Sequence, residues 1–213
     1  MTKSRARLKD KTLQVFLDEL AGKAPTPGGG SVAAILGAQA AALISMVCNL
    51  TIGKPRYAEV EAAMQDLLQQ SEALRAQLTA LIQADVDVFD RLTAGYALPK
   101  TTPAEQAARS DAVQTILKQA AEVPLACAGA CAEAIRLSQS AADIGNLNVV
   151  SDAGVAAMAA YAGLKSAALN VYVNVGSLKD RAVADEKLAR LESILSSVDV
   201  AAEEIYRRVQ ARL

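Results

Sequence analysis

The sequence predicts an all-α protein, a multihelical bundle around two buried helices built from small residues. Apolar residues make up 52% of the 213 residues, whereas aromatic residues make up only 3%, a composition that favours closely packed helices. Several long stretches repeat apolar residues every three or four positions, which is the spacing of one helix face. No stretch shows the clear alternation of apolar and polar residues that indicates a strand.

Composition also bounds the organisation and the partners. The length suits one domain over residues 1–213, and we find no linker or internal repeat. A net charge of −1 gives no electrostatic case for nucleic acid or an anionic membrane surface. Three cysteines argue against a disulfide framework, and the basic N-terminus lacks the apolar core of a signal peptide. We therefore expect a cytoplasmic protein.

The first element expected is an amphipathic helix over residues 8–21, which Gly22 ends. A glycine loop follows it, opened by two prolines, and we expect Gly30 or Ser31 to be the N-cap of the next helix. The apolar face of the first helix consists of Leu13, Phe16, Leu17 and Leu20, and the glycines of the loop are Gly28, Gly29 and Gly30.

Residues 32–48 then predict a helix that is apolar on all sides, because only Gln39 and Ser45 are polar and none is charged. Such a helix must be buried, in protein or in lipid. The stretch is roughly long enough to span a bilayer, but it is built on Ala and Gly, so membrane insertion would be weakly driven. Small residues at four-residue spacing let helices approach closely. We favour the central helix of a soluble protein over a membrane span.

The glycine loop resembles two nucleotide-binding motifs but fits neither. A dinucleotide fingerprint must follow a strand, and the residues KAPTP are not one; a Walker A loop ends in Gly-Lys-Ser/Thr, which is absent. Two interpretations remain. The free N–H groups of the helix start form an anion site, or the glycines only make a tight turn.

Residues 57–93 predict one long helix with a single apolar stripe, and two members of that stripe are polar. Burying the hydroxyl of Ser71 costs little free energy. Burying Asp85 costs more, because a buried carboxylate needs partners or a shifted pKa. Asp85 is therefore the carboxylate that the pattern marks, either as a functional group or as part of a structural ion pair. The stripe runs through Val60, Met64, Leu67, Ser71, Leu74, Leu78, Leu81, Asp85, Phe89 and Leu92.

Three further helices complete the prediction. One begins with the capping residues Thr102, Pro103 and Glu105 and runs to about Ala121, where Pro124 starts or kinks a continuation that ends near Gly145. A second small-residue helix follows the loop of Asn146 and is capped by Ser151 or Asp152, and we expect it to pack on the first one. The last is an amphipathic helix over residues 180–213.

The chemistry available is limited by the absence of histidine. A general acid or base must then be Asp, Glu, Lys, Tyr or Cys, and a Ser-His or Cys-His nucleophile is excluded. Cys127 and Cys131 lie one helical turn apart, but without histidine or a further cysteine nearby we expect packing, not a metal site. The glycine loop, Asp85 and Asp152 are candidates to converge on one site.

Four stretches, taken together, resemble the cyclodeaminase/cyclohydrolase family of folate enzymes over nearly the whole chain and in order. They are PTPGGGSVAA…VCNLTIGK, DVDVFDRLTAGYALPK, VPLAC and GNLNVVSDAGVAAMAAYAGLKSAALNVYVN. The resemblance implies an all-α homodimer, a tetrahydrofolate substrate, no metal and no cofactor. It implies hydrolysis of 5,10-methenyltetrahydrofolate to 10-formyltetrahydrofolate; the alternatives are a cyclodeaminase that releases ammonia from 5-formiminotetrahydrofolate and a non-catalytic folate-binding protein.

Carried over by position, the resemblance assigns candidate site residues. Asp85 and Asp152 are the candidate catalytic carboxylates, either of which would favour a cationic substrate and orient or deprotonate the attacking water. Lys54 or Lys100 would pair with the glutamate carboxylates of folate. The remaining substrate-binding candidates are Gly28, Gly29, Gly30, Ser31, Asn146 and Ser151.

Overall fold

The computed structural model describes residues 7–198 and 200–213, and within these ranges it contains helices and no strand. The predicted all-α class is thereby confirmed. The elements in chain order are η1 (Leu8–Asp10), α1 (Leu13–Leu20), α2 (Gly29–Asn49), η2 (Pro55–Val60), α3 (Glu61–Tyr96), α4 (Pro103–Ile144), η3 (Leu147–Val149), α5 (Val150–Gly176), α6 (Arg181–Ser196) and α7 (Ala201–Gln210).

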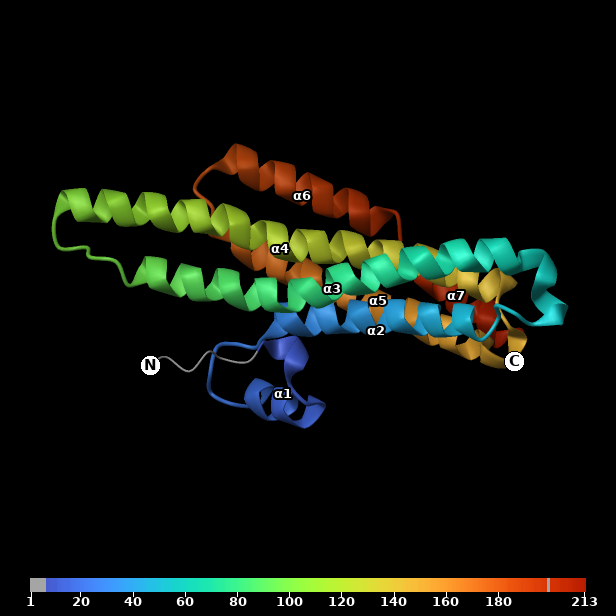
Figure 1. Cartoon of the computed structure of the whole chain (residues 1–213). Helices are drawn as coiled ribbons and strands as arrows, with labels where there is room; N and C mark the ends of the chain where they lie inside the picture. The colour runs from blue at the N-terminus through green and yellow to red at the C-terminus, as the bar shows by residue number, and fades with distance from the viewer. Residues whose placement is uncertain (1–6, 199) are drawn as a thin grey trace.

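The helices α2 and α5 run antiparallel through the molecule, and the long hairpin of α3 and α4 lies beside them (Figure 1). Their contact requires a glycine on α5. A Cβ on Gly163 would lie 2.9 Å from the carbonyl oxygen of Ala33 and 3.2 Å from the backbone nitrogen of Gly37, both on α2. Larger residues would push the backbones apart, so the expected pairing of the two small-residue helices is confirmed.

The start of α2 lies two or three residues before the predicted N-cap, Gly30 or Ser31. Gly28 is the N-cap, and Gly30 and Ser31 lie inside the first turn. The helix before it is also shorter than expected: Thr12 caps α1, and the residues before it form the separate η1. Of the expected apolar face, Phe16 is buried and Leu20 packs partly buried against the core, whereas Leu13 and Leu17 are exposed.

The predicted stripe of α3 is correct in its first half and drifts out of the core in its second. Met64, Ser71 and Leu78 are buried, and Ser71 Oγ lies 2.8 Å from Ser45 Oγ across the contact with α2. Phe89, however, is 37% exposed. Steps that alternate between three and four average 3.5 residues per turn, so the stripe rotates by about 20° per heptad around a helix of 3.6. Asp85 consequently lies at the rim of the core.

The helix α4 does not end near Ala121 as expected but continues through Pro124, from Pro103 to Ile144. Proline removes the N–H that would bond the carbonyl four residues earlier, which is that of Ala120. Asn174 on α5 replaces it, donating from Nδ2 to the Ala120 oxygen at 2.8 Å. At the other end, Thr102 and Glu105 form the predicted capping box.

Two further boundaries correct the prediction. Ser151 and Asp152 do not cap α5, because the N-cap is Val149 and both residues lie in the first turn. The expected last helix is two helices, α6 and α7, so one continuous helix over residues 180–213 is wrong. The hydroxyls of Ser196 and Ser197 bond the carbonyls of Ser193 and Ile194 at the end of α6, which is how serine competes with helix continuation.

Two segments have the length and apolar character of a membrane span, Gly29–Asn49 and Leu147–Gly176. About half of each, 56% and 44% of the most apolar window, is buried inside the chain itself. Burial of this kind is typical of core helices in a bundle, and the remaining half leaves apolar side chains exposed along both helices.

Candidate functional site

A carboxylate on α3 meets the glycine start of α2. Ser31 Oγ donates a hydrogen bond to Asp85 Oδ2 at 3.0 Å. A Cβ built on Gly30 would lie only 2.0 Å from Asp85 Oδ1, so no larger residue fits while the carboxylate keeps this position. The glycine at position 30 is thus required by the close approach of Asp85 as well as by the turn.

The surroundings of Asp85 shift its proton affinity. Burial raises the pKa of Asp85, and hydrogen bonds from the side chain and backbone of Ser31 offset part of that rise. The N-terminus of α2, whose first N–H groups have no partner within the helix, lies at the same place. A carboxylate with a raised pKa at a polar, partly buried point is suited to taking up and returning a proton.

Asn170 on α5 is a neighbour of the glycine loop that the sequence pattern did not select. A Cβ on Gly29 would lie 3.6 Å from Asn170 Nδ2, which itself donates to the carbonyl of Ser166 at 2.9 Å. Three helices therefore contribute polar groups here: α2 the glycines and Ser31, α3 Asp85, and α5 Asn170. The available signal was an amide on a helix rich in small apolar residues.

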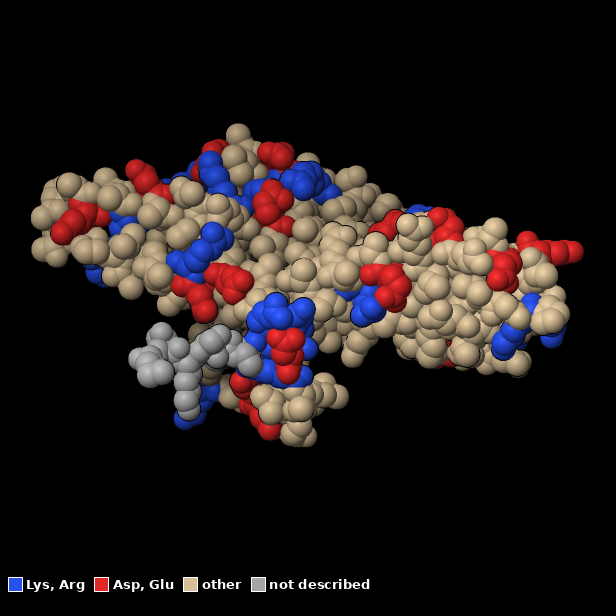
Figure 2. Space-filling view, in the orientation of Figure 1, with Lys and Arg blue, Asp and Glu red and all other residues tan. Residues whose placement is uncertain are grey.

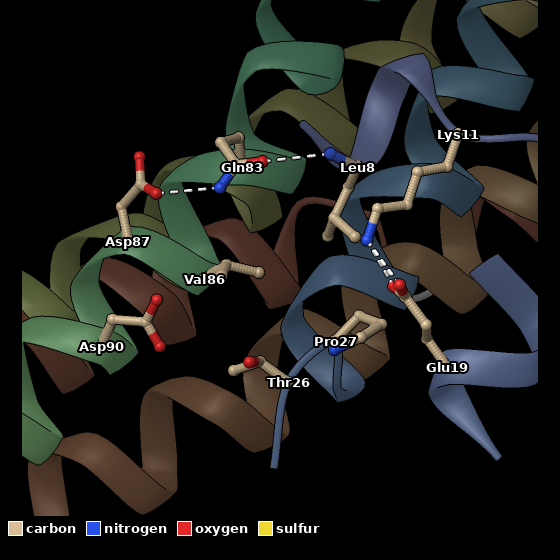
Figure 3. A pocket seen from close by; sticks show the side chains of 9 residues that line it. All are labelled: Leu8, Lys11, Glu19, Thr26, Pro27, Gln83, Val86, Asp87 and Asp90. Atoms are coloured by element: carbon tan, nitrogen blue, oxygen red, sulfur yellow. Dashed lines mark hydrogen bonds and ion pairs between the residues drawn. The ribbon is translucent and has the colours of Figure 1, made fainter. Parts of the chain in front are cut away.

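A cavity of about 190 Å³ lies beside the loop, between the N-terminal segment and α3 (Figure 3). Lys11 Nζ pairs with Glu19 at 2.5 Å on one side. On the other, Gln83 accepts from the N–H of Leu8 at 3.1 Å. The α3 side also carries Asp87 and Asp90, and the loop side Thr26 and Pro27. The cavity is thus a polar recess next to the carboxylate site.

Three of the other predicted site residues, Asn146, Ser151 and Asp152, lie at the opposite end of α2. Asn146 is 3% exposed; its Nδ2 donates to the carbonyl of Leu50 at 2.8 Å, and its Oδ1 accepts from Tyr57 Oη at 3.3 Å. Its own N–H donates to Thr51 Oγ1 at 2.9 Å. These bonds join the end of α2 to the start of α5, so Asn146 has a structural role in this chain. The sequence pattern selected neither Tyr57 nor Thr51.

Ser151 and Asp152 follow in the first turn of α5, where Ser151 is exposed and Asp152 half-buried. Twenty residues of helix and exit turn separate Ser31 from Thr51, which corresponds to about 30 Å at 1.5 Å per residue. Asp85 and Asp152 therefore do not converge within one chain, contrary to the expectation. Of that expected cluster, the structure brings together the glycine loop, Ser31 and Asp85.

The two predicted lysines lie at the ends of the molecule and are exposed. Lys54 precedes η2, at the end of α2 away from Asp85. Lys100 lies in the turn between α3 and α4, at the tip of the hairpin. Asp85 is 11 residues of helix before Tyr96, or about 17 Å along α3. Neither lysine contacts the carboxylate, so each remains a candidate only for a distal part of an extended ligand.

The three cysteines are buried and unpaired. Burial raises the pKa of Cys48 to about 11, and a hydrogen bond with Cys127 together with burial raises that of Cys131. Cys48 and Cys131 are consequently thiols with low nucleophilicity. Across the ranges that the structure describes, no three Cys, Asp or Glu side chains group as a metal ion would require.

The fold and site define a class: helical bundles in which a carboxylate faces the glycine start of a buried helix. The family model described as formiminotransferase-cyclodeaminase matches residues 12–193. The chain belongs to this family.

Individual relatives agree with that assignment. Methenyltetrahydrofolate cyclohydrolase of Methylorubrum extorquens is 54% identical over 96% of this chain and 98% of its own length. Formimidoyltransferase-cyclodeaminase of Rattus norvegicus is 35% identical over 96% of this chain, which matches 38% of that longer protein. The crystal structure of formiminotetrahydrofolate cyclodeaminase from Thermotoga maritima superposes with a TM-score of 0.81 at 30% identity, covering 96% of both chains.

Proposed function

We propose that this protein hydrolyses 5,10-methenyltetrahydrofolate to 10-formyltetrahydrofolate. The structural observation that carries the proposal is the carboxylate of Asp85, held by Ser31 in the space that Gly30 leaves open. The 54% identity to the Methylorubrum cyclohydrolase along nearly the full length of both chains supports the same reaction.

The substrate is a cation whose charge is spread over the N5–C–N10 bridge. Asp85 would stabilise that charge and accept a proton from the attacking water as the new C–O bond forms. Breaking the C–N5 bond then leaves the formyl group on N10 and returns the electron pair to N5, which takes up a proton. The net reaction consumes one water and releases one proton, so it needs no electron or group carrier, and we propose that no cofactor takes part.

The remaining predicted residues are proposed to bind parts of the substrate. Gly28, Gly29 and the other amides of the loop would hold a pterin oxygen or a carboxylate, since helix N-termini favour acceptors. Lys54 or Lys100 would pair with the glutamate carboxylates of folate. Removing each lysine in turn should raise KM and leave kcat unchanged if it only binds the glutamate tail.

The protein is proposed to act as a homodimer in the cytoplasm. Charged side chains lie over α1, α3, α4 and α6, whereas the surface along the middle of α2 is largely uncharged (Figure 2). Two antiparallel copies joined through their α2 and α5 faces would bring the Asp85 end of one copy near the Asp152 end of the other. The exposed apolar side chains of these helices are Met46, Leu50, Val155, Met158, Leu169, Tyr172 and Val173.

The first experiment measures the loss of methenyltetrahydrofolate absorbance with purified protein, against the spontaneous rate in the same buffer. We expect a clear acceleration that the variant Asp85→Asn loses. Normal turnover by that variant would remove Asp85 from the chemistry. No acceleration by the wild-type protein would overturn the proposed hydrolysis.

Mixing inactive variants tests whether two copies share the site. Each homodimer of Asp85→Asn or Asp152→Asn is expected to be inactive, but a mixed dimer would contain one intact site if the two carboxylates come from different copies. Restored turnover on mixing therefore supports a shared site. No restoration, with mixed dimers demonstrated, would exclude a site formed by Asp85 of one copy and Asp152 of the other.

A second candidate reaction is the release of ammonia from 5-formiminotetrahydrofolate. The observation that favours it is the TM-score of 0.81 to the Thermotoga protein, whose structure is described as a formiminotetrahydrofolate cyclodeaminase. The two reactions form and open the same bridge and are separated by an ammonia assay with 5-formiminotetrahydrofolate as substrate. Ammonia release without acceleration of methenyl hydrolysis would make this the preferred function.

A further inference from the structure

Phe89 on α3 is an aromatic side chain that the bundle leaves partly uncovered. It lies one helical turn after Asp85 and on the same side of α3, because residues four apart share a helix face. Its side chain is 37% exposed, whereas Phe16, the other phenylalanine of the chain, is 7% exposed. A single exposed apolar residue is ordinary on a protein surface, so the direction in which Phe89 points decides what its exposure means.

Phe89 points toward the side of α3 that faces the bundle interior. It lies eleven residues after Leu78, which is about three helical turns, so the two side chains leave α3 in nearly the same direction. Leu78 is fully buried, and its Cδ2 lies 2.8 Å from the position of a Cβ on Gly37 of α2. The direction that α2 covers at Leu78 is therefore open to solvent at Phe89.

The register between α2 and α3 explains the difference. Leu78 lies opposite Gly37, and Asp85, seven residues later on α3, lies opposite Gly30, seven residues earlier on α2. One more turn in the same antiparallel register places Phe89 opposite the loop that precedes α2. The hairpin of α3 and α4 continues past this point (Figure 1), so the end of the α2 cover is a second reason for the exposure of Phe89.

Polar groups flank the start of α2 on the α5 side as well. The amide of Asn170 lies 3.6 Å from the position of a Cβ on Gly29, and its Nδ2 donates to the carbonyl of Ser166. Among the residues that the structure describes, none donates a hydrogen bond to Asn170 Oδ1. The start of α2 is thus bordered by the carboxylate of Asp85, an amide oxygen without a partner and the uncovered ring of Phe89.

These groups match the chemistry of the proposed substrate. Its positive charge is spread over a planar bridge that is fused to the pterin ring. The face of a phenyl ring attracts a cation, and it also packs on other flat rings. Asp85 and Phe89 are separated by about 6 Å along the axis of α3, so one rigid ring system can contact both side chains.

We propose that Phe89 determines specificity for the cationic folate: its ring packs on the face of the methenyl-bridged ring system, and Asp85 meets the same bridge at its edge. The inference rests on the proposed folate substrate and adds the group that selects its charge. Hydrolysis opens the bridge and removes the positive charge, so the contact weakens when the neutral product forms, which favours product release.

The variants Phe89→Leu and Phe89→Tyr test the contact, because leucine is apolar without a ring and tyrosine keeps the ring. For Phe89→Leu we expect the KM for methenyltetrahydrofolate to rise about threefold or more with little change in kcat. We expect Phe89→Tyr to remain near wild type. The control Tyr206→Leu removes a ring of similar exposure, 45%, from α7 and should leave KM unchanged. A wild-type KM for Phe89→Leu, or equal impairment of the leucine and tyrosine variants, would overturn the proposal.

A neutral ligand tests the preference for charge. The inhibition constant of 5-formyltetrahydrofolate, which lacks the cationic bridge, should rise less in Phe89→Leu than the KM of the methenyl cation, and equal rises would overturn the selection of charge. If the wild-type protein does not hydrolyse methenyltetrahydrofolate, the proposed hydrolysis has failed, and equilibrium binding of the same two ligands measures the contact directly. Weaker binding of the cation by Phe89→Leu would then still support the contact, whereas unchanged or absent binding would overturn it.

Discussion

Replacing Gly30 by alanine should separate the position of the Asp85 carboxylate from the stability of the fold. The new Cβ would begin 2.0 Å from Asp85 Oδ1, and ordinary contact begins at 3.4 Å, so the carboxylate must retreat by about 1.4 Å. This movement breaks the 3.0 Å bond from Ser31. A misplacement of about 1 Å in a catalytic group costs on the order of 100-fold in rate, or roughly 2.7 kcal/mol of barrier.

Stability should respond much less than turnover. The lost hydrogen bond costs about 0.5–1.5 kcal/mol, while alanine in place of glycine within a helix contributes about 0.5–1 kcal/mol. These effects oppose one another, so we expect the free energy of unfolding to change by less than about 1 kcal/mol. Urea unfolding and steady-state kinetics on the same preparation measure both quantities.

Gly129→Ala is the matched control. Gly129 lies inside α4, and a Cβ there would meet only Ile194 Cδ1 at 3.9 Å. We expect a gain of about 0.5–1 kcal/mol in stability and unchanged kinetics. Wild-type turnover by Gly30→Ala would refute the reasoning, because it would show that the reaction tolerates displacement of Asp85.

Three further substitutions test other parts of the structure. Asp85→Asn should raise the melting temperature at pH 7 while abolishing turnover, and the thermal gain should shrink in melts below the ordinary aspartate pKa. Asn174→Ala should cost about 1–3 kcal/mol in urea unfolding, since it leaves a carbonyl unpaired, and much less in a Pro124→Ala background, where the helix restores that bond. Glu122→Gln should destabilise the α4–α6 contact by a similar amount, because Lys187 is buried and pairs with Glu122.

The two carboxylates have opposite pH dependence. The pKa of Asp85 is raised in the folded state, so its contribution to stability is fully present below the ordinary value of 3.8 and is lost as pH rises through the folded pKa. Burial tends to raise the pKa of Glu122, but the bonds and charges of Lys187 and Arg190 outweigh it and lower the pKa. Its contribution is present above 4.5 and is lost as pH falls through the folded pKa. A Glu122→Gln variant whose stability deficit persists at pH 2 would contradict this account.

The sequence predicted the parts of the fold that depend on local rules. The capping box of Thr102 and Glu105 and the pairing of α2 with α5 follow from short-range chemistry and from side-chain size, and both are confirmed. The predictions that failed depend on contacts between residues that are far apart in the sequence. Pro124 stays inside a helix because Asn174, 50 residues later, bonds the carbonyl that proline leaves free, and no local pattern contains that bond.

In the candidate site, too, the local pattern marked one residue, whereas the positions of others depend on tertiary packing. Asp85 was found because a charged residue interrupted an apolar stripe, and the structure adds the reason why it lies beside Gly30. Asn146 was assigned to a ligand, yet its amide joins the end of α2 to the start of α5. Asp152 lies at the far end of α2 from Asp85, a separation that depends on the antiparallel packing of two helices and not on either motif.

The separation of Asp85 from Asp152 within one chain is the main argument for the proposed dimer. Burying Asp85 disfavours its ionised form, which costs free energy of folding. Proteins retain such costs mainly at sites where binding or catalysis requires the buried group. One chain presents this carboxylate at one end of α2 and a second carboxylate at the other, with apolar faces exposed between them. A two-fold axis across those faces would cover the apolar surface and bring the two ends together in one step. If mixed variants fail to restore turnover, Asp85 of one copy and Asp152 of the other do not share a site, and the exposed faces then require a different explanation.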